Sequence, residues 1–211
     1  MRDLIRTLTA PAVHPTVPEL TLQLATELTP LWSATEALLQ QQNMAPPYWA
    51  FAWPGSVGLA RYLLDHPDLV AGKRVIDVGA GCGVAALAAA RSGAVATAVE
   101  VDRLAGEAIA MNAATNGLAV AVVIADLLDG APPEAELFVV GDLCYDAPLT
   151  RRLLGFLRRA QAQGAEVWVG DPGRTFLPSG LAPLASYEVD TLRELETHGR
   201  CVTRVMRMLP A

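Results

Sequence analysis

The stretch VIDVGAGCGVAALAAA, residues 75–90, decides the fold that this sequence predicts. Its first four residues form a short apolar segment typical of a buried strand, and its last seven form an alanine-rich segment typical of a helix. Gly79, Gly81 and Gly83 lie between the two. Glycine permits a tight backbone path and the close approach of a ligand, and the amide groups at the start of the next helix point toward that ligand. The stretch therefore predicts a strand, a tight turn and a helix that begin a βαβ unit.

Strand-like and helix-like segments continue to alternate along the chain after this stretch. Because a strand, a crossover helix and another strand form a parallel unit, this order predicts an α/β fold with a mostly parallel sheet and helices on both faces. Two final strand-like segments, residues 187–195 and 201–209, have only a short link between them and predict an antiparallel hairpin. The other predicted strands are residues 73–79, 95–102, 119–127, 136–143 and 166–171, and the predicted helices are residues 84–93, 104–117 and 148–164.

The N-terminal part of the chain differs from this alternating pattern. Leucines recur with helical spacing in residues 17–28 and 31–42, so the sequence predicts two helices separated by Pro30. A turn-rich segment with many aromatic residues follows. Residues 56–64 are again predicted as a helix, with Ser56 as its amino-terminal cap.

The length and the composition fit one globular domain. The chain has 211 residues, and 52% of them are hydrophobic, which is enough to build a sizeable core. No internal repeat or low-complexity linker divides the chain. We therefore predict a single domain, residues 1–211, with a helical and aromatic N-terminal extension (1–55) and a ligand-binding core (56–211).

Charge and residue usage argue against several classes of partner. The net charge is −6 and no long basic run is present, which disfavours nucleic-acid binding. The longest apolar runs are only strand-length and contain glycines, so no membrane span is predicted. Three cysteines and three histidines are scattered, and they predict neither a disulfide framework nor a metal site. Since the start of the chain lacks a signal-peptide core, we expect a cytoplasmic protein, and we expect it to be a monomer.

The glycine turn and the acids near it predict the ligand. A dinucleotide site prefers G-x-G-x-x-G, but Val84 stands where the third glycine would be. The glycines instead follow G-x-G-x-G after Asp77, the pattern of S-adenosylmethionine (SAM) sites, where the acid can face a charged amino-acid group. Glu100 ends the next strand, where nucleoside-binding α/β folds hold ribose hydroxyls. Asp126 ends the strand after that, and it could accept the adenine amine. A tight turn without a ligand, with Asp126 as a solvated strand end, is the alternative.

Three stretches give the chain a resemblance to class I, seven-β-strand methyltransferases. They are VIDVGAGCGVAALAAARSGA, AVEVDRLAGEAIAMNAATNG and GDLCYD. More narrowly, the chain resembles the family that methylates lysines of the electron transfer flavoprotein β-subunit. The stretches VPELTLQLATELTPLW, PPYWAFAWPGSVGLARYLLDHPDLVAGK and GDPGR carry that narrower resemblance over nearly the whole chain.

The resemblance implies a Rossmann-like sheet of seven strands, with SAM as the methyl donor, S-adenosylhomocysteine as its product and a protein lysine as the acceptor. The electron transfer flavoprotein β-subunit is the implied partner. The glycine pattern and the resemblance together predict these cofactor-binding residues: Trp53, Gly55, Asp77, Gly79, Ala80, Gly81, Glu100, Val101, Asp126, Leu127 and Asp142.

The predicted catalytic residues are Asp142 and Tyr145, at the end of the fourth strand of the core. They match the family motif Asp-x-x-Tyr. A free lysine has a pKa of about 10.4, so the site must hold the amine and help it lose a proton. A carboxylate can accept a hydrogen bond from that amine, and an aromatic ring can stabilise an alkylammonium. The alternatives are a strand-end aspartate that bonds to local amides and a tyrosine that only packs. Leu143 and Cys144 replace the Pro-Pro pair of many amide and nucleobase methyltransferases, which disfavours those acceptors.

Other interpretations of the sequence stay open. A small-molecule N-methyltransferase acting on a nicotinamide-like acceptor, a ribosomal-protein methyltransferase and a non-catalytic SAM-binding module are the alternatives, and an NAD-dependent oxidoreductase is more distant. Trp49 is expected to plug the open side of the sheet. Asp171 and Arg174 either shape the acceptor channel or only pair with each other.

Overall fold

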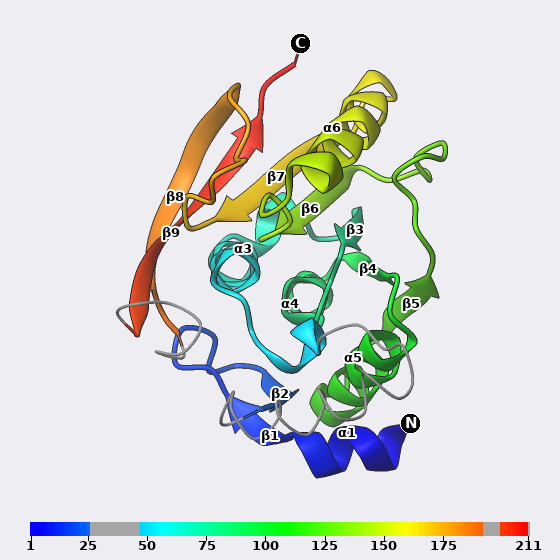
Figure 1. Ribbon diagram of the computed structural model, residues 1–211, viewed down its shortest axis with the longest axis vertical. Coiled ribbons are helices and arrows are strands. Elements are labelled where there is room, and N and C mark those ends of the chain that lie inside the picture. Colours follow the sequence, from blue (N-terminus) through cyan, green and yellow to red (C-terminus); the bar gives the residue numbers. More distant parts are fainter. Residues whose placement is uncertain (26–46, 192–198, 211) are drawn as a thin grey trace.

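The main sheet has seven strands, as expected from the sequence. The computed structural model describes residues 1–25, 47–191 and 199–210. Within them the sheet has the order β5-β4-β3-β6-β7-β9-β8 (Figure 1). The strands from β3 to β7 pair in parallel, and β9 is antiparallel to both β7 and β8. Their bounds are β3 Arg74–Val78, β4 Val95–Glu100, β5 Val120–Ile124, β6 Leu137–Gly141, β7 Glu166–Asp171, β8 Leu181–Asp190 and β9 Arg200–Met208.

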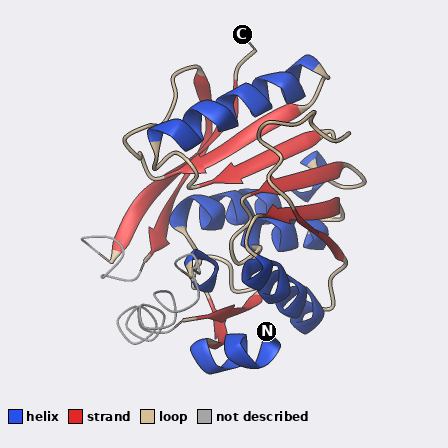
Figure 2. Cartoon of the chain, turned by 45° about the vertical axis from the view of Figure 1, so that its right-hand side comes forward, coloured by secondary structure: helices blue, strands red, loops and turns tan. Residues whose placement is uncertain are grey.

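Helices cover both faces of this sheet, which confirms the predicted layers. Successive side chains of β6 point to opposite faces, so Leu137 and Val139 enter one core while Phe138 and Val140 enter the other. The first core packs against α3 (Pro54–Asp65) and α4 (Val84–Arg91), with α5 (Arg103–Asn116) on the same side. The second core packs against α6 (Ala147–Ala162). Figure 2 shows α6 on one side of the strands and the other helices of the core on the opposite side.

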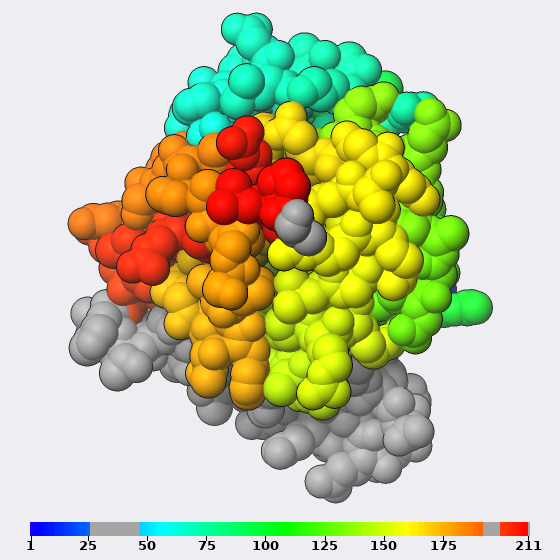
Figure 3. All heavy atoms as spheres, turned by 90° about the horizontal axis from the view of Figure 1, so that it is seen from above, coloured from blue at the N-terminus to red at the C-terminus, as the bar shows by residue number. Residues whose placement is uncertain are grey.

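The C-terminal hairpin is antiparallel as predicted, but its first strand lies earlier in the chain than predicted, and residues 192–195 of the predicted strand lie outside the described residues. β8 begins at Leu181, well before the predicted start at residue 187. Pro183 and a register irregularity between Pro183 and Ala185 break the alternation that marks a strand. Proline is tolerated here because β8 is an edge strand. After β9 the chain continues against α6, where Arg158 donates to the Leu209 carbonyl at 2.7 Å. Figure 3 shows these red C-terminal residues seated between the yellow helix and the orange strand region.

The N-terminal extension contains a hairpin where a helix was predicted. After α1 (Arg2–Leu8), β1 (Ala10–Val13) pairs antiparallel with β2 (Thr21–Leu24), so the predicted helix over residues 17–28 is wrong at β2. Leu20, Leu22 and Leu24 are all buried, because leucines spaced by two also fit a strand. Residues 17–20 form a turn before β2, and residues 26–28 of that segment, like the predicted helix over residues 31–42, lie outside the described residues.

Side chains of α5 form hydrogen bonds with the backbone of β2 on the edge that does not pair with β1. Asn112 Oδ1 accepts from the Gln23 amide at 2.7 Å, and Asn116 Oδ1 accepts from the Thr21 amide at 2.9 Å. Asn116 Nδ2 also donates to the Thr21 carbonyl at 2.7 Å. These bonds satisfy backbone groups that β1 does not reach. A tertiary partner therefore decides that the segment is a strand.

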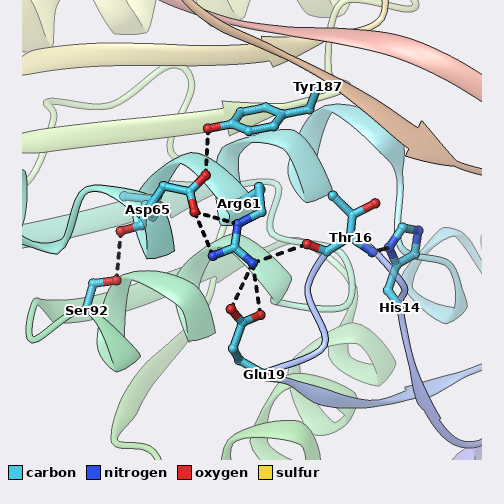
Figure 4. A network of polar contacts seen from close by, with 8 residues as sticks. His14, Thr16, Glu19, Arg61, Asp65, Ser92 and Tyr187 are labelled. Atoms are coloured by element: carbon cyan, nitrogen blue, oxygen red, sulfur yellow. Dashed lines mark hydrogen bonds and ion pairs between the residues drawn. The ribbon is translucent and has the colours of Figure 1, made fainter.

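A polar network joins the extension to the core (Figure 4). Arg61 of α3 donates to both oxygens of Glu19 at 2.8 and 3.0 Å, and its Nε donates to Asp65 at 3.0 Å. Tyr187 of β8 donates to the other Asp65 oxygen at 3.1 Å. Nearby, the ring of His14 lies 2.8 Å from the Asp190 carbonyl at the end of β8. The extension is thus fastened to both α3 and β8. Two short 3-10 helices, η1 (Tyr48–Ala50) and η2 (Pro67–Leu69), flank α3.

Candidate active site

A cavity of about 540 Å³ opens at the carboxyl ends of β3, β4, β5 and β6. The strand order reverses between β3 and β6, and open α/β sheets bind their ligands beside such a reversal. The volume is within the range of small-molecule sites. Ten of the predicted site residues line this cavity: Trp53, Gly79, Ala80, Gly81, Glu100, Val101, Asp126, Leu127, Asp142 and Tyr145.

The glycine loop after β3 forms the floor of the cavity. Gly79, Gly81 and Gly83 have φ angles of 68°, 56° and 81°, a region that disfavours residues with a side chain. A Cβ added to Gly79 would lie 2.7 Å from Leu143, and one added to Gly83 would lie 3.0 Å from Ile109. A Cβ on Gly81 would meet no protein atom within 4 Å. The space in front of Gly81 is therefore open to a ligand, while the other two glycines allow close packing.

Glu100 joins the end of β4 to this loop. Its Oε1 accepts from the Gly81 amide at 2.8 Å, and its Oε2 accepts from the Val101 amide at 2.8 Å. Burial raises the pKa of the Glu100 carboxyl, and the backbone donors oppose that rise. Its Oε2 also accepts from the Asp102 amide at 3.4 Å, so about one of the four lone-pair positions of an ionised carboxylate stays open to a hydroxyl in the cavity. The extra methylene of glutamate, compared with aspartate, lets the carboxylate reach the glycine loop.

Two predicted cofactor residues lie outside the lining of the cavity. Asp77 is buried within β3, where its Oδ2 accepts from the Ala86 amide in the first turn of α4 at 3.0 Å. Burial raises the pKa of Asp77 to about 7. Gly55 lies in the first turn of α3. A direct contact between either residue and a ligand stays a prediction.

Asp126 lines the cavity on the side of β5. Its Oδ1 accepts from the Leu128 amide at 3.0 Å, and its Oδ2 accepts from Arg152 at 2.8 Å. Hydrogen bonding to the Arg152 guanidinium lowers the pKa of Asp126. Arg152 also pairs with Asp129 at 2.6 Å. The sequence pattern gave no signal for Arg152, because α6 brings it to the cavity from a distant part of the chain.

Asp142 stands at the end of β6 in a strained conformation. Its φ is 58°, and it is the one non-glycine residue with a positive φ in the described parts of the chain. Such strain is concentrated at functional sites. Its Oδ2 accepts from the Ser56 amide at 3.1 Å, and its Oδ1 accepts from Arg174 Nε and Nη2 at 3.1 and 2.8 Å. Burial raises the pKa of Asp142 to about 6, against the effect of the Arg174 charge.

Three glycines allow the amino end of α3 to reach Asp142. A Cβ on Gly55 would overlap the Gly170 carbonyl and lie 2.6 Å from Asp142 Oδ2. A Cβ added to Gly141 would overlap Ser56, and a Cβ added to Gly170 would overlap the Gly55 carbonyl. Ser56 is not the predicted cap, since α3 begins at Pro54 and Trp53 occupies the cap position. The carboxylate of Asp142 takes over that capping role from a different element.

Aromatic side chains form the rim beside Asp142. Tyr145 is 52% exposed and Tyr48 is 46% exposed, and their ring centroids lie 6.4 Å apart. The Trp53 ring lies 6.0 Å from that of Tyr48, and its indole nitrogen donates to the Tyr48 carbonyl at 2.8 Å. Tyr48 is a lining residue that the sequence analysis did not assign, although its aromatic-rich segment was noted. Trp49 is buried against α5 and also lines the cavity.

The loop after β7 resolves the two interpretations of Asp171 and Arg174. Asp171 Oδ1 accepts from the backbone amides of Gly173 and Arg174 at 2.7 Å each, so it shapes the loop and does not pair with the guanidinium. The guanidinium of Arg174 instead pairs with Asp142 and lies 5.7 Å from the Trp53 ring centroid. Arg174 thus belongs to the Asp142 side of the cavity.

Comparison with known proteins places this arrangement in a class and then in a family. Residues 54–140 match the methyltransferase small domain. The magnesium protoporphyrin IX methyltransferase of Synechocystis PCC 6803, solved with bound SAM, is 13% identical at a TM-score of 0.54, covering 74% of this chain and 78% of that chain. The sheet order and these two matches show the fold of class I SAM-dependent methyltransferases.

Curated relatives give the narrower assignment. The electron transfer flavoprotein beta subunit lysine methyltransferase of Xenopus laevis is 38% identical over 193 residues, which cover 88% of this chain and 77% of that protein. The protein of the same name from Rattus norvegicus is 41% identical over 160 residues, which cover 74% of this chain and 62% of the rat protein. The chain belongs to this family of methyltransferases.

Within residues 1–25, 47–191 and 199–210, no helix combines the length and the apolar character that a membrane span needs. No group of three or more His, Cys, Asp or Glu side chains in that part of the chain is arranged to hold a metal ion.

Proposed function

We propose that this protein transfers the methyl group of SAM to lysine side chains of the electron transfer flavoprotein β-subunit. The observation that carries the proposal is the position of Asp142. Its buried carboxylate lies beside the aromatic rim and lines the same cavity as the glycine loop. The substrate follows from the family relationship. The aligned part covers only about three fifths of the rat relative.

The residues around the loop fit the adenosine end of SAM. The open space at Gly81 admits the ligand close to the backbone, and Glu100 offers about one free lone-pair position for a ribose hydroxyl. We assign Asp126, on the β5 side of the same cavity, to the adenine amine. Bound in this way, SAM supplies an activated methyl group on a positively charged sulfur. No side chain of the enzyme has to act as a nucleophile, because the lysine nitrogen itself forms the new bond.

The residues at the rim fit a lysine as the acceptor. The donors that the structure gives to Asp142, two from Arg174 and one from Ser56, leave about one lone-pair position of the carboxylate for an amine. The half-exposed rings of Tyr145 and Tyr48 can line a lysine side chain that enters from solvent. Holding the amine in line with the methyl group lowers the barrier, since alignment can contribute roughly 7–11 kcal/mol in favourable cases.

A methylation assay with defined acceptors tests this proposal. The purified protein is incubated with methyl-labelled SAM and with electron transfer flavoprotein, nicotinamide or free lysine, and tandem mass spectrometry locates the label. We expect label on lysines of the β-subunit, its loss in D142N and a reduction in Y145A, which removes the ring that lines the lysine. Label on nicotinamide with none on the flavoprotein would establish the small-molecule alternative, and SAM binding without turnover of any acceptor would support the non-catalytic module.

A further inference from the structure

Asp142 is held from two sides by groups that come from different elements. The amide of Ser56, in the first turn of α3, fixes Oδ2, while two nitrogens of Arg174 fix Oδ1. Only 7% of the Asp142 side chain and 21% of the Arg174 side chain are exposed. A side chain with both oxygens engaged has little freedom to rotate, so its direction into the cavity is set by these two partners.

Arg174 is itself set by the fold. Asp171, which is fully buried at the end of β7, accepts from the amides of Gly173 and Arg174 through one oxygen. This turn brings the guanidinium back toward β6, where it also faces the Trp53 ring at 5.7 Å. An arginine held through its backbone and stacked near an indole loses little additional entropy when it binds a carboxylate.

We propose that Arg174 is a positioning residue for methyl transfer: its guanidinium keeps Asp142 ionised and oriented toward the acceptor amine. The proposal rests on the proposed function, because it assigns Arg174 to the acceptor side of that reaction. Arg174 acts through Asp142 and needs no contact with the acceptor.

The surroundings of Asp142 explain why it needs such a partner. Burial disfavours the charged carboxylate, and the negative Asp171 disfavours it further. The other titratable side chains nearby are Cys144, whose thiol pKa burial raises to about 11, and Tyr145. Arg174 is the group that stabilises the negative charge most directly, by charge and by hydrogen bonding. Without it, a larger fraction of Asp142 would be protonated at neutral pH and unable to accept the amine hydrogen bond.

The test compares R174A and R174K with R200A. Arg200 is the control because its guanidinium also pairs with carboxylates, those of Glu188 and Asp190, but on the exposed hairpin of β8 and β9. We expect R200A to keep native activity. R174A should lose about fivefold in kcat/KM at pH 6, about twofold at pH 7 and less at pH 9, since the acid limb of its pH profile moves up by about one pH unit from the native value. R174K keeps the charge and should lie between. Millimolar guanidinium chloride should partly restore R174A and should not restore D142N.

A direct titration separates this proposal from the proposed function. The Asp142 carboxyl resonance is followed by ¹³C NMR against pH in the native protein and in R174A, and it is identified by its absence in D142N. We expect the midpoint to be higher in R174A. An unchanged midpoint, or an equal loss of activity at every pH without rescue by guanidinium, would overturn the positioning role. If the native protein methylates no flavoprotein lysine, the proposed function fails, while the titration still decides what Arg174 does.

Discussion

Gly55, Gly141 and Gly170 allow the close packing that brings the amino end of α3 to Asp142. Because a Cβ on Gly55 would overlap the Gly170 carbonyl, we expect G55A to push the amino end of α3 away from β6 and β7 and to break the bond between Ser56 and Asp142. The melting temperature should fall, and methyl transfer should fall more than SAM affinity. Calorimetry and the labelling assay measure the two effects.

Gly155 provides the control for that substitution. It lies inside α6, and the nearest atom to an added Cβ would be the flexible end of Arg159 at 3.5 Å. G155A should therefore leave activity unchanged and stabilise the fold slightly, by about 0.5–1 kcal/mol, since alanine favours a helix over glycine. If G55A is as stable and as active as G155A, the overlap between the added Cβ and the Gly170 carbonyl is relieved without loss of stability or activity, and the expectation is wrong.

Asp77 links the glycine loop to the pH dependence of stability. Burial raises its pKa to about 7 in the folded protein, and the unfolded value is about 3.9. Between these values the folded state keeps a proton that the unfolded state releases, so this group makes the fold less stable as pH rises. We expect D77N to melt several degrees above the native protein at pH 8, with the difference disappearing near pH 4.

The exposed Asp68 is the comparison for Asp77. D68N removes a carboxylate from the short helix η2 at the surface, and its melting temperature should follow that of the native protein at every pH. All melting curves are measured without ligand, because a bound cation near Asp77 would change the ionisation of its carboxylate. A D77N protein that is less stable than the native one at pH 8 would contradict the expected sign.

The sequence could indicate most residues that line the site, but it could not indicate the contacts that join distant segments there. Gly79, Gly81 and Glu100 follow from a single βαβ unit, because strand, turn and helix fix their relative positions locally. The contacts of Asp142 with Ser56 and Arg174 join three elements that meet only in the folded sheet. No spacing along the chain encodes such contacts.

At the scale of elements, the N-terminal hairpin shows why periodicity alone is not sufficient. Leu20 and Leu24 are compatible with a helix and with a strand, and local propensity did not separate the two. The strand is stabilised by α5, whose Asn112 and Asn116 side chains form hydrogen bonds with the backbone of β2. The longer segments from β3 to β7 were predicted well, because repeated βαβ order is a stronger signal than one ambiguous segment.

The same hairpin carries a second pH effect, through His14. The Thr16 amide donates to His14 Nδ1 at 3.2 Å, so Nε2 holds the proton and donates to the Asp190 carbonyl at 2.8 Å. Burial lowers the pKa of His14 in the folded protein. Below about pH 6.5 the unfolded chain takes up a proton that the folded chain resists, so the stability from this contact is present above that pH and is lost as pH falls.

Hydrogen exchange measures this loss. We expect amides of residues 10–24 to lose protection at pH 5.5 relative to pH 7.5, after correction for intrinsic rates, while amides of β3 and β4 keep theirs. H14Q should remove most of the difference, and H66Q, at an exposed histidine, should not. Equal pH dependence of the hairpin in H14Q and in the native protein would assign the effect to another group.

At the scale of the whole molecule, the cavity gathers residues from distant parts of the chain. Tyr48 and Trp53 come from the segment before α3, Glu100 from β4 and Arg174 from the loop after β7. A ligand that contacts them together binds the folded state and not the unfolded one. At a hundredfold excess over its Kd, such a ligand adds about 2.7 kcal/mol of stability, which corresponds to a rise of roughly 5–10 °C in Tm for a domain of this size.

We therefore expect SAM to raise the melting temperature by that amount and NAD to leave it unchanged. E100Q should reduce the shift, because the neutral amide accepts more weakly from a ribose hydroxyl and cannot hold both the Gly81 and Val101 amides through oxygen. The Arg174 variants should retain the shift, since the guanidinium acts on the acceptor side of the cavity. A comparable shift with NAD would instead place a dinucleotide in front of the glycine loop, against the absence of the third glycine at Val84.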